Sequence, residues 1–227
     1  MRVGILQPSY LPWLGYFEQI SRVDKFVLYD DVQYDKHGWR NRNRIKTANG
    51  VQWLTVPVHF SLTDASRLCD IEIDQRKAWS RKHLNSIRQN YSRAPYFDQY
   101  FPMFDEVFSQ KWTSLVSLNV AFLRRFSEAL GIQTEFVFSS TIANSGDKCQ
   151  RLINICKMLK ADVFYEGAAG KNYIDENLFR EEGIKVEYQN YQHPIYPQLY
   201  GEFVSHLSII DVLFNCGQET SRIIGIE

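Results

Sequence analysis

Short apolar segments alternate along the chain with longer segments in which apolar residues recur at helical spacing. The apolar segments cover residues 3–6, 25–29, 134–138, 163–165 and 184–188. The first two are continuous apolar runs, which is typical of parallel strands covered on both faces. Between them, Leu14, Phe17 and Ile20 recur as they would on one face of a helix. The pattern predicts an α/β fold with a mostly parallel sheet.

The middle of the chain has the pattern of helices. Asp74 suits the N-cap of a helix over residues 75–91. The aromatic segment 97–108 is predicted to be helical after Pro102, and an amphipathic helix over 114–130 ends at Gly131. A further helix is predicted over 147–159, where the α/β pattern has resumed. We therefore expect residues 1–227 to form a single α/β domain with a mainly helical insertion at about 75–130.

A hairpin is predicted around the Asn49-Gly50 pair, a strong turn signal between two strand-like segments. In an extended segment, Arg40, Arg42, Arg44 and Lys46 would project from one face. Such a cationic row either protects a solvated edge strand from aggregation or binds phosphate oxygens, which suit the arginine fork. The sequence leaves both interpretations open.

Candidate binding residues follow the first two predicted strands. Gln7, Pro8, Tyr10, Trp13 and Tyr16 come after the first strand, and Tyr34 follows the second. Ligands of open parallel sheets bind outside the carboxyl ends of the strands, so these groups are expected to face one crevice. The alternative is that the prolines and aromatic residues of this region, Trp13 and Tyr16 among them, only pack the edge of the sheet.

Candidate catalytic residues occur in two places. Asp30 and Asp31 end the second strand, and His193 lies in an irregular loop that proline interrupts. A carboxylate or an imidazole can accept a proton in general base catalysis. For His193 the alternative is a structural role, in which its hydrogen bonds hold the loop. Tyr196 and Gln198 of the same loop are candidate binding residues.

A glycine-rich turn follows the strand at 163–165. Gly167, Gly170 and Lys171 together suggest a site where an anion approaches the backbone closely. The spacing is not that of a Walker loop, and a turn that only packs is an equal alternative.

Composition narrows the function classes. Lys+Arg and Asp+Glu balance at 26 each, so no overall field draws the protein to nucleic acid, although 15% of the residues are aromatic. The 4 cysteines form no CxxC pair and no histidine stands near one at ligand spacing, so we expect no zinc site. We assign no metal ligand, and the sequence leaves open whether the adjacent carboxylates Asp30 and Asp31 hold a divalent ion. The N-terminus lacks the pattern of a signal peptide and no apolar run has membrane-spanning length, so we expect a cytoplasmic protein without membrane insertion.

Several long motifs resemble the WbqC-like protein family. They are the opening GILQPSYLPWLGYFEQI and VLYDDVQY, the segment WRNRNRIKT, and the closing HPIYPQ and FVSHLSIIDVLFNCG. The resemblance spans nearly the whole chain. The genes of this family occur in clusters for O-antigen and other polysaccharides, so the resemblance implies a part in making a modified sugar. The function we expect is transfer of an acyl or aminoacyl group, such as glycyl, to the amino group of a nucleotide-linked deoxy sugar.

A more distant likeness relates the opening segment to the Rossmann-like HUP nucleotidyltransferases and the pantothenate-synthetase-like ligases. Those proteins carry an HxGH motif at the start of the first helix, where the histidines stabilise phosphates during adenylyl transfer. Trp13 and Tyr16 stand at the histidine positions here, and neither carries positive charge. The resemblance therefore implies a donor that arrives activated, as an aminoacyl-tRNA or an acyl-CoA, rather than the use of ATP.

These expectations assign a role to each group of candidate residues and leave alternative functions open. Asp30, Asp31 or His193 would take the proton of the sugar amine, the arginines of the hairpin would bind phosphates, and Tyr10, Trp13 and Tyr34 would stack on a base or sugar. The rivals are a non-catalytic nucleotide-sugar-binding protein, an ATP-dependent adenylating ligase and a nucleic-acid-binding domain. A nucleotide-linked sugar is the expected partner and tRNA a candidate donor. The oligomeric state is open, with a homodimer among the alternatives.

Overall fold

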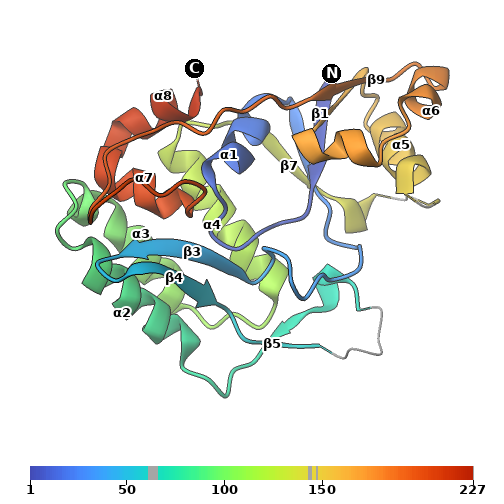
Figure 1. Cartoon of the computed structure of the whole chain (residues 1–227). Coiled ribbons are helices and arrows are strands. Elements are labelled where there is room, and N and C mark those ends of the chain that lie inside the picture. Colours follow the sequence, from blue (N-terminus) through green and yellow to red (C-terminus); the bar gives the residue numbers. More distant parts are fainter. Residues whose placement is uncertain (61–65, 143–144, 147, 227) are drawn as a thin grey trace.

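Five parallel strands form the central sheet of the protein (Figure 1). The computed structural model describes residues 1–60, 66–142, 145–146 and 148–226. The strand order is β7-β2-β1-β8-β9, and the strands are β1 (Arg2–Leu6), β2 (Lys25–Leu28), β7 (Glu135–Phe138), β8 (Val163–Glu166) and β9 (Lys185–Tyr188). The chain builds outward from β1 first on one side and then on the other. This Rossmann-like arrangement confirms the predicted α/β class and places the reversal of strand order between β1 and β8.

Both faces of the sheet are covered, which explains the continuous apolar runs. Side chains of successive residues in a strand point to opposite faces. Val3 and Ile5 therefore pack on one face with helix α5 (Lys148–Met158) and helix α6 (Glu176–Glu181). On the other face, Phe26 packs with helix α1 (Leu14–Ser21).

The predicted helical insertion consists of α2 (Trp79–Tyr91), α3 (Phe97–Ser109) and α4 (Leu115–Ala129). Its aromatic side chains share one apolar cluster with the α1 face of the sheet. Phe126 of α4 meets Phe17 of α1 edge to face, with ring centroids 5.7 Å apart. The C-terminal helices α7 (Ile209–Cys216) and α8 (Thr220–Ile224) complete this cluster (Figure 1).

The cationic segment forms the predicted hairpin, with β3 (Arg42–Thr47) antiparallel to β4 (Gly50–Thr55). Gly50 has a φ of +104°, a conformation that glycine adopts without steric cost. A second antiparallel pair, β5 (Val58–His59) and β6 (Glu72–Ile73), follows. Short 3₁₀ turns lie at Leu68–Asp70, Ser139–Thr141, Ala168–Asn172 and Gly217–Glu219.

Two helix boundaries differ from the sequence prediction. Helix α2 begins at Trp79 instead of residue 75, because the Asp74 carboxylate accepts a hydrogen bond from the Arg76 N–H (3.0 Å) and closes a separate turn. Helix α3 begins at Phe97 and continues through Pro102. Asp147, the predicted first residue of α5, lies outside the described residues. In the described part of the chain, no helix is both long enough and apolar enough to cross a bilayer.

Replacing Phe122 of α4 by alanine tests whether the insertion and the sheet form one core. Phe122 is fully buried and contacts Tyr10 of the loop after β1 as well as Phe104 of α3. We expect Phe122→Ala to lower the free energy of unfolding by about 3–5 kcal/mol. Urea unfolding followed by circular dichroism and tryptophan fluorescence should show one shifted transition. Met158→Ala, at an exposed position, is the control, and two separate transitions would contradict a shared core.

Candidate functional site

The loop between β1 and α1 is irregular, and a buried amide fixes its shape. Leu11 has a φ of +45°, which is uncommon for a residue other than glycine. The side-chain amide of Asn43, on the hairpin, donates hydrogen bonds to the carbonyls of Leu11 (2.7 Å) and Tyr10 (3.3 Å). These bonds satisfy carbonyls that no secondary structure pairs, so the hairpin sets the course of the loop.

A second buried amide joins this loop to the helical insertion. Asn119 of α4 is fully buried. Its side-chain nitrogen donates to the carbonyl of Pro8 (3.1 Å) and to the carbonyl of Arg40 (2.8 Å). The insertion therefore positions both the loop after β1 and the residue that enters the hairpin.

The C-terminal segment reaches the same place. The Ser208 N–H donates to the carbonyl of Arg44 (2.9 Å), and the Ile209 N–H donates to the carbonyl of Pro12 (2.8 Å). Trp13 lies across the start of α1, where a Cβ on Gly15 would fall 2.3 Å from its ring. The opening loop, the hairpin and the start of α7 thus form one structural unit.

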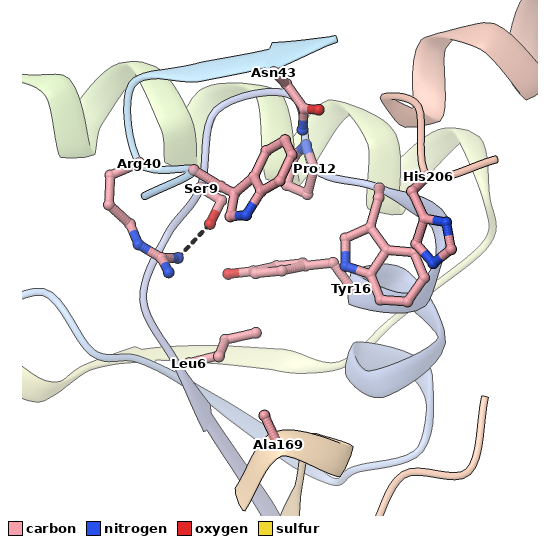
Figure 2. Close-up of a pocket in the computed structure, with 10 residues that line it drawn as sticks. Leu6, Ser9, Pro12, Tyr16, Arg40, Asn43, Ala169 and His206 are labelled. Atoms are coloured by element: carbon pink, nitrogen blue, oxygen red, sulfur yellow. Dashed lines mark hydrogen bonds between the residues drawn. The ribbon is translucent and has the colours of Figure 1, made fainter. Parts of the chain in front are cut away.

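Two adjacent cavities open at this unit, outside the carboxyl ends of β1 and β8. The first, here called the tryptophan cavity, has a volume of about 410 Å³ and is shown in Figure 2. The second, here called the glutamate cavity, measures about 700 Å³. Leu6 and Arg40 line both cavities. Their position at the reversal of strand order is where open α/β sheets bind ligands.

Different residues line the two cavities. The tryptophan cavity is bounded by Ser9, Pro12, Trp13, Tyr16, Trp39, Asn43, Ala169 and His206. The glutamate cavity is bounded by Ile5, Gln7, Tyr29, Lys148, Leu152, Glu166 and Tyr173. Of the predicted binding residues, Gln7, Trp13, Tyr16 and Arg40 are therefore brought together at the cavities.

Arg40 is the cation at the junction. Its guanidinium donates to the Gln7 carbonyl (3.2 Å) and to the Ser9 hydroxyl, and burial lowers the pKa of this guanidinium. Within the described residues no carboxylate lies within ion-pair distance of it, although Asp35 acts on its charge from farther away. Its Nε is shut off from solvent without a hydrogen-bond partner. A partly buried charge without a counter-ion is costly. An anionic ligand in the cavities would supply that counter-ion.

Glu166 is a functional candidate that sequence reasoning missed. It ends β8, is only 4% exposed and lines the glutamate cavity. Burial raises the pKa of its carboxyl from 4.5 to about 7, although hydrogen bonds from the Gly167 N–H (3.0 Å) and the Tyr173 hydroxyl (3.2 Å) oppose the shift. A carboxyl that titrates near neutral pH is suited to proton transfer. The signal in the sequence was a charged residue at the end of an otherwise apolar strand.

The glycine-rich turn encloses this carboxylate. A Cβ on Gly170 would lie 2.3 Å from the Glu166 Cγ, so only glycine lets the turn close over the side chain. The ammonium of Lys171 lies over the Tyr188 ring, 5.5 Å from its centroid. Two of the predicted anion-binding residues, Gly167 and Gly170, thus contact an acid in the structure, whereas Lys171 lies against a tyrosine ring.

The acidic pair after β2 is engaged with β7 and α5. The Asp30 carboxylate accepts hydrogen bonds from the Ser140 N–H (2.9 Å) and the Ser140 hydroxyl (2.7 Å). The Asp31 carboxylate forms an ion pair with Arg151. Neither aspartate lines the two cavities. Among the described residues, no three histidine, cysteine, aspartate or glutamate side chains are placed to hold a metal ion.

His193 holds a second histidine in place. Its Nε2 accepts a hydrogen bond from the His206 N–H (3.0 Å), and its Nδ1 lies 2.9 Å from the Pro194 carbonyl. These contacts require a neutral ring that carries its proton on Nδ1. Burial, the larger cause, and the neighbouring His206 lower the pKa of His193. His193 does not line either cavity, so its geometry fits the structural alternative.

His206, which His193 supports, does line the tryptophan cavity. Its φ of +57° is rare for histidine, and its carbonyl accepts a hydrogen bond from the Arg44 guanidinium (3.0 Å). Its ring stacks on Trp13, with centroids 5.2 Å apart. Figure 2 shows His206 and Arg40 on opposite sides of the cavity, with Tyr16 between them.

The remaining candidates lie away from the cavities. Tyr10 is fully buried and its hydroxyl bonds to the His83 Nδ1 (2.8 Å). Tyr34 packs on Phe60, with centroids 5.8 Å apart. Tyr196 is buried.

The residues of the predicted cationic row lie in different surroundings. Arg40 faces the cavities, whereas the guanidinium of Arg42 lies over the Trp53 ring, 4.9 Å from its centroid. Lys46 is buried, and its ammonium donates to the Gln198 side-chain oxygen (3.1 Å). Gln198 in turn bonds the backbone of Val204, so it holds its own loop.

Fold and site define an α/β protein with two adjacent cavities at the switch point of a parallel sheet. The model of the WbqC-like protein family matches residues 7–223, so the chain belongs to that family. It is 37% identical over 220 residues to an uncharacterized protein of Mycobacterium tuberculosis, Rv1507c, with 96% of this chain and 95% of the relative covered. No solved structure matches the chain.

The variant Glu166→Gln should change how stability depends on pH. Because the carboxyl titrates at about 7 in the folded protein and at 4.5 as its ordinary value, the native state binds more protons than the unfolded state between these pH values. The free energy of unfolding of the wild type therefore falls as pH rises through this range, by about 3 kcal/mol from this group. At pH 8 the variant should be the more stable protein. Denaturant unfolding from pH 4 to 8 measures this, with Glu181→Gln at an exposed position as control. Parallel curves for wild type and Glu166→Gln would contradict the assignment.

Proposed function

We propose that the protein is a transferase that forms an amide on the amino group of a nucleotide-linked amino-deoxy sugar, in the synthesis of a bacterial surface polysaccharide such as O-antigen. The observation that carries the proposal is that Arg40, a cation without an ion-pair partner among the described residues, and Glu166, an acid with a pKa of about 7, line one cavity. A nucleotide-linked amino sugar carries the matching groups, a diphosphate and an amine. The family resemblance supports the choice of pathway.

Arg40 would hold the diphosphate at the junction of the cavities. A guanidinium offers several N–H donors in a planar fork that suits phosphate oxygens. Trp13 presents a flat apolar surface to the tryptophan cavity, which suits packing against a sugar or acyl group. The sugar amine would then lie on the side of the glutamate cavity.

Glu166 would act as the general base. A sugar ammonium group first transfers a proton to the ionised carboxylate, which leaves the nitrogen lone pair free to attack the carbonyl carbon of an activated acyl or aminoacyl donor. The new C–N bond forms as the C–O bond of an ester, or the C–S bond of a thioester, breaks. The leaving oxygen or sulfur departs with the electron pair and takes the proton back from Glu166. The acylated nitrogen releases its second proton to water, so the products are the amide, an alcohol or thiol, and one proton. Aminoacyl-tRNA and acyl-CoA both fit this scheme as donors.

Glu166→Gln should lower kcat by about 100-fold or more, because an amide cannot accept the proton. In the wild type, kcat should rise with pH, and the midpoint of the rise should lie at about pH 7, where the buried carboxyl ionises. The measurement is mass-spectrometric detection of acylated UDP- or dTDP-amino sugars with glycyl-tRNA or acetyl-CoA as donor.

The acidic pair supplies the matched comparison. Asp31→Asn removes a carboxylate that is paired with Arg151 and does not line the cavities. We expect it to retain most of the activity. Loss of activity in Asp31→Asn together with full activity in Glu166→Gln would return the base role to the acidic pair. Binding of the sugar nucleotide without turnover of any donor would favour a non-catalytic binding protein.

One observation favours a second candidate, ATP-dependent adenylation. Trp13 occupies a position where HUP nucleotidyltransferases have a histidine, and the ring of His206 stacks directly on Trp13 in the cavity. A histidine from the C-terminal segment thus stands beside the start of α1. In this reaction a carboxylate oxygen attacks the α-phosphorus of ATP and pyrophosphate leaves. Exchange of labelled pyrophosphate into ATP, lost in His206→Ala, would support this candidate over the transferase.

A further inference from the structure

Two tryptophans, Trp39 just before the hairpin and Trp53 on β4, are exposed at the surface. Trp39 is 42% exposed and Trp53 is 45% exposed. Their rings stack on each other, with centroids 5.3 Å apart and planes inclined by 29°. Neither belongs to the apolar clusters of the described residues. Exposing two large rings side by side forgoes the stabilisation that burial would give, and such patches commonly mark binding surfaces.

Two arginines lie against the rings of Trp39 and Trp53, and they give the exposed patch formed by these rings a positive charge. The Arg42 guanidinium lies 4.9 Å from the centroid of Trp53, and the Arg44 guanidinium lies 5.6 Å from Trp39 and 5.8 Å from Trp53. In the part of the chain that the structure describes, neither arginine forms an ion pair. Their hydrogen bonds go instead to the carbonyls of His37 and His206. The patch therefore offers flat rings together with uncompensated positive charge.

The patch is continuous with the tryptophan cavity. Trp39 lines that cavity, and the next residue in the chain is Arg40, the cation at the junction of the two cavities. The Trp39 carbonyl accepts a hydrogen bond from the Tyr10 N–H (3.1 Å), so the clamped loop after β1 fixes the position of Trp39. A ligand anchored at Arg40 by an anionic group would meet Trp39 on leaving the cavity.

We infer that Trp39, supported by Trp53, is the stacking site for the base of a nucleoside diphosphate whose phosphates contact Arg40. The inference rests on the proposed function for the choice of a nucleotide-linked sugar as the complete ligand, and it adds where the nucleotide lies. The base would sit at the mouth of the tryptophan cavity, the diphosphate at the junction and the sugar inside. Aromatic faces bind bases of any sequence, because every base presents a π-face.

The size and charge of the surface favour one nucleotide over a nucleic-acid strand. The platform consists of two rings, and only Trp39 belongs to both the platform and the cavity. The chain as a whole has no net charge, whereas strand-binding proteins carry an extended basic groove. Arginine beside an aromatic face suits a base followed by phosphate.

Calorimetric titration of the full-length protein with UDP, dTDP, GDP, ADP and inorganic pyrophosphate tests the inference. Pyrophosphate has the phosphates but no base. Trp39→Leu should weaken binding of the best nucleoside diphosphate about tenfold or more, while pyrophosphate affinity stays within about twofold. Trp39→Phe keeps a stacking surface and should retain most of the affinity. Trp112→Phe, at a half-buried tryptophan between α3 and α4, is the control.

Several outcomes would overturn the inference. Unchanged nucleotide affinity in Trp39→Leu, an equal loss for pyrophosphate, or no nucleotide binding by the folded wild type would each do so. An oligonucleotide that ends in CCA and binds more than tenfold tighter than every nucleoside diphosphate would assign the platform to RNA instead. The titrations contain neither sugar nor acyl donor. A protein that binds nucleotides through Trp39 but forms no amide therefore keeps this inference and refutes only the transferase.

Discussion

The site depends on two buried side-chain amides that replace secondary structure. The loop after β1 forms neither strand nor helix from Gln7 to Leu11, yet side chains pair the carbonyls of Pro8, Tyr10 and Leu11. Asn43 bonds Tyr10 and Leu11 from the hairpin, and Asn119 bonds Pro8 from the insertion. Removing either amide would leave buried carbonyls unpaired, which costs about 1–3 kcal/mol for each group. Because the same Asn119 also bonds the Arg40 carbonyl, the fold of the loop and the position of the main cation are one constraint.

The charged groups near the loop after β1 fall into two sets, which differ in whether another protein group compensates the charge. Asp31 is compensated by Arg151, and Asp30 by hydroxyl and amide donors of the turn after β7. Arg40 and Glu166 have no opposite charge as partner among the described residues, although both line the same cavity. Burial acts on the two groups in the same sense, since it disfavours the charged form of each. Groups kept in this state are costly, and a ligand that supplies an anion and an amine would relieve the cost.

The C-terminal segment gives the site its other wall. His193 was a catalytic candidate on chemical grounds, but both of its ring nitrogens are engaged, and it supports His206. Arg44 was a phosphate-binding candidate, and its guanidinium bonds the His206 carbonyl and lies against two exposed tryptophans. The motifs WRNRNRIKT and FVSHLSIIDVLFNCG therefore contact each other in the folded protein. Their residue types are explained by contacts with each other as well as by contacts with a ligand.

The sequence by itself determined those strands, turns and helices that depend on residues close together in the chain. Continuous apolar runs predicted the parallel strands, Asn49-Gly50 predicted the hairpin, and helical spacing predicted the insertion, because each signal lies within a few adjacent residues. The opening loop and the turn after β8 were also named as candidate sites from their place at strand ends. Only the tertiary structure decided which polar side chains pair with other groups of the protein. The ion pair between Asp31 and Arg151, for example, joins residues that are far apart in the sequence. Likewise the burial that raises the pKa of Glu166 comes from the packing of the turn and the sheet around it, and no local pattern records it.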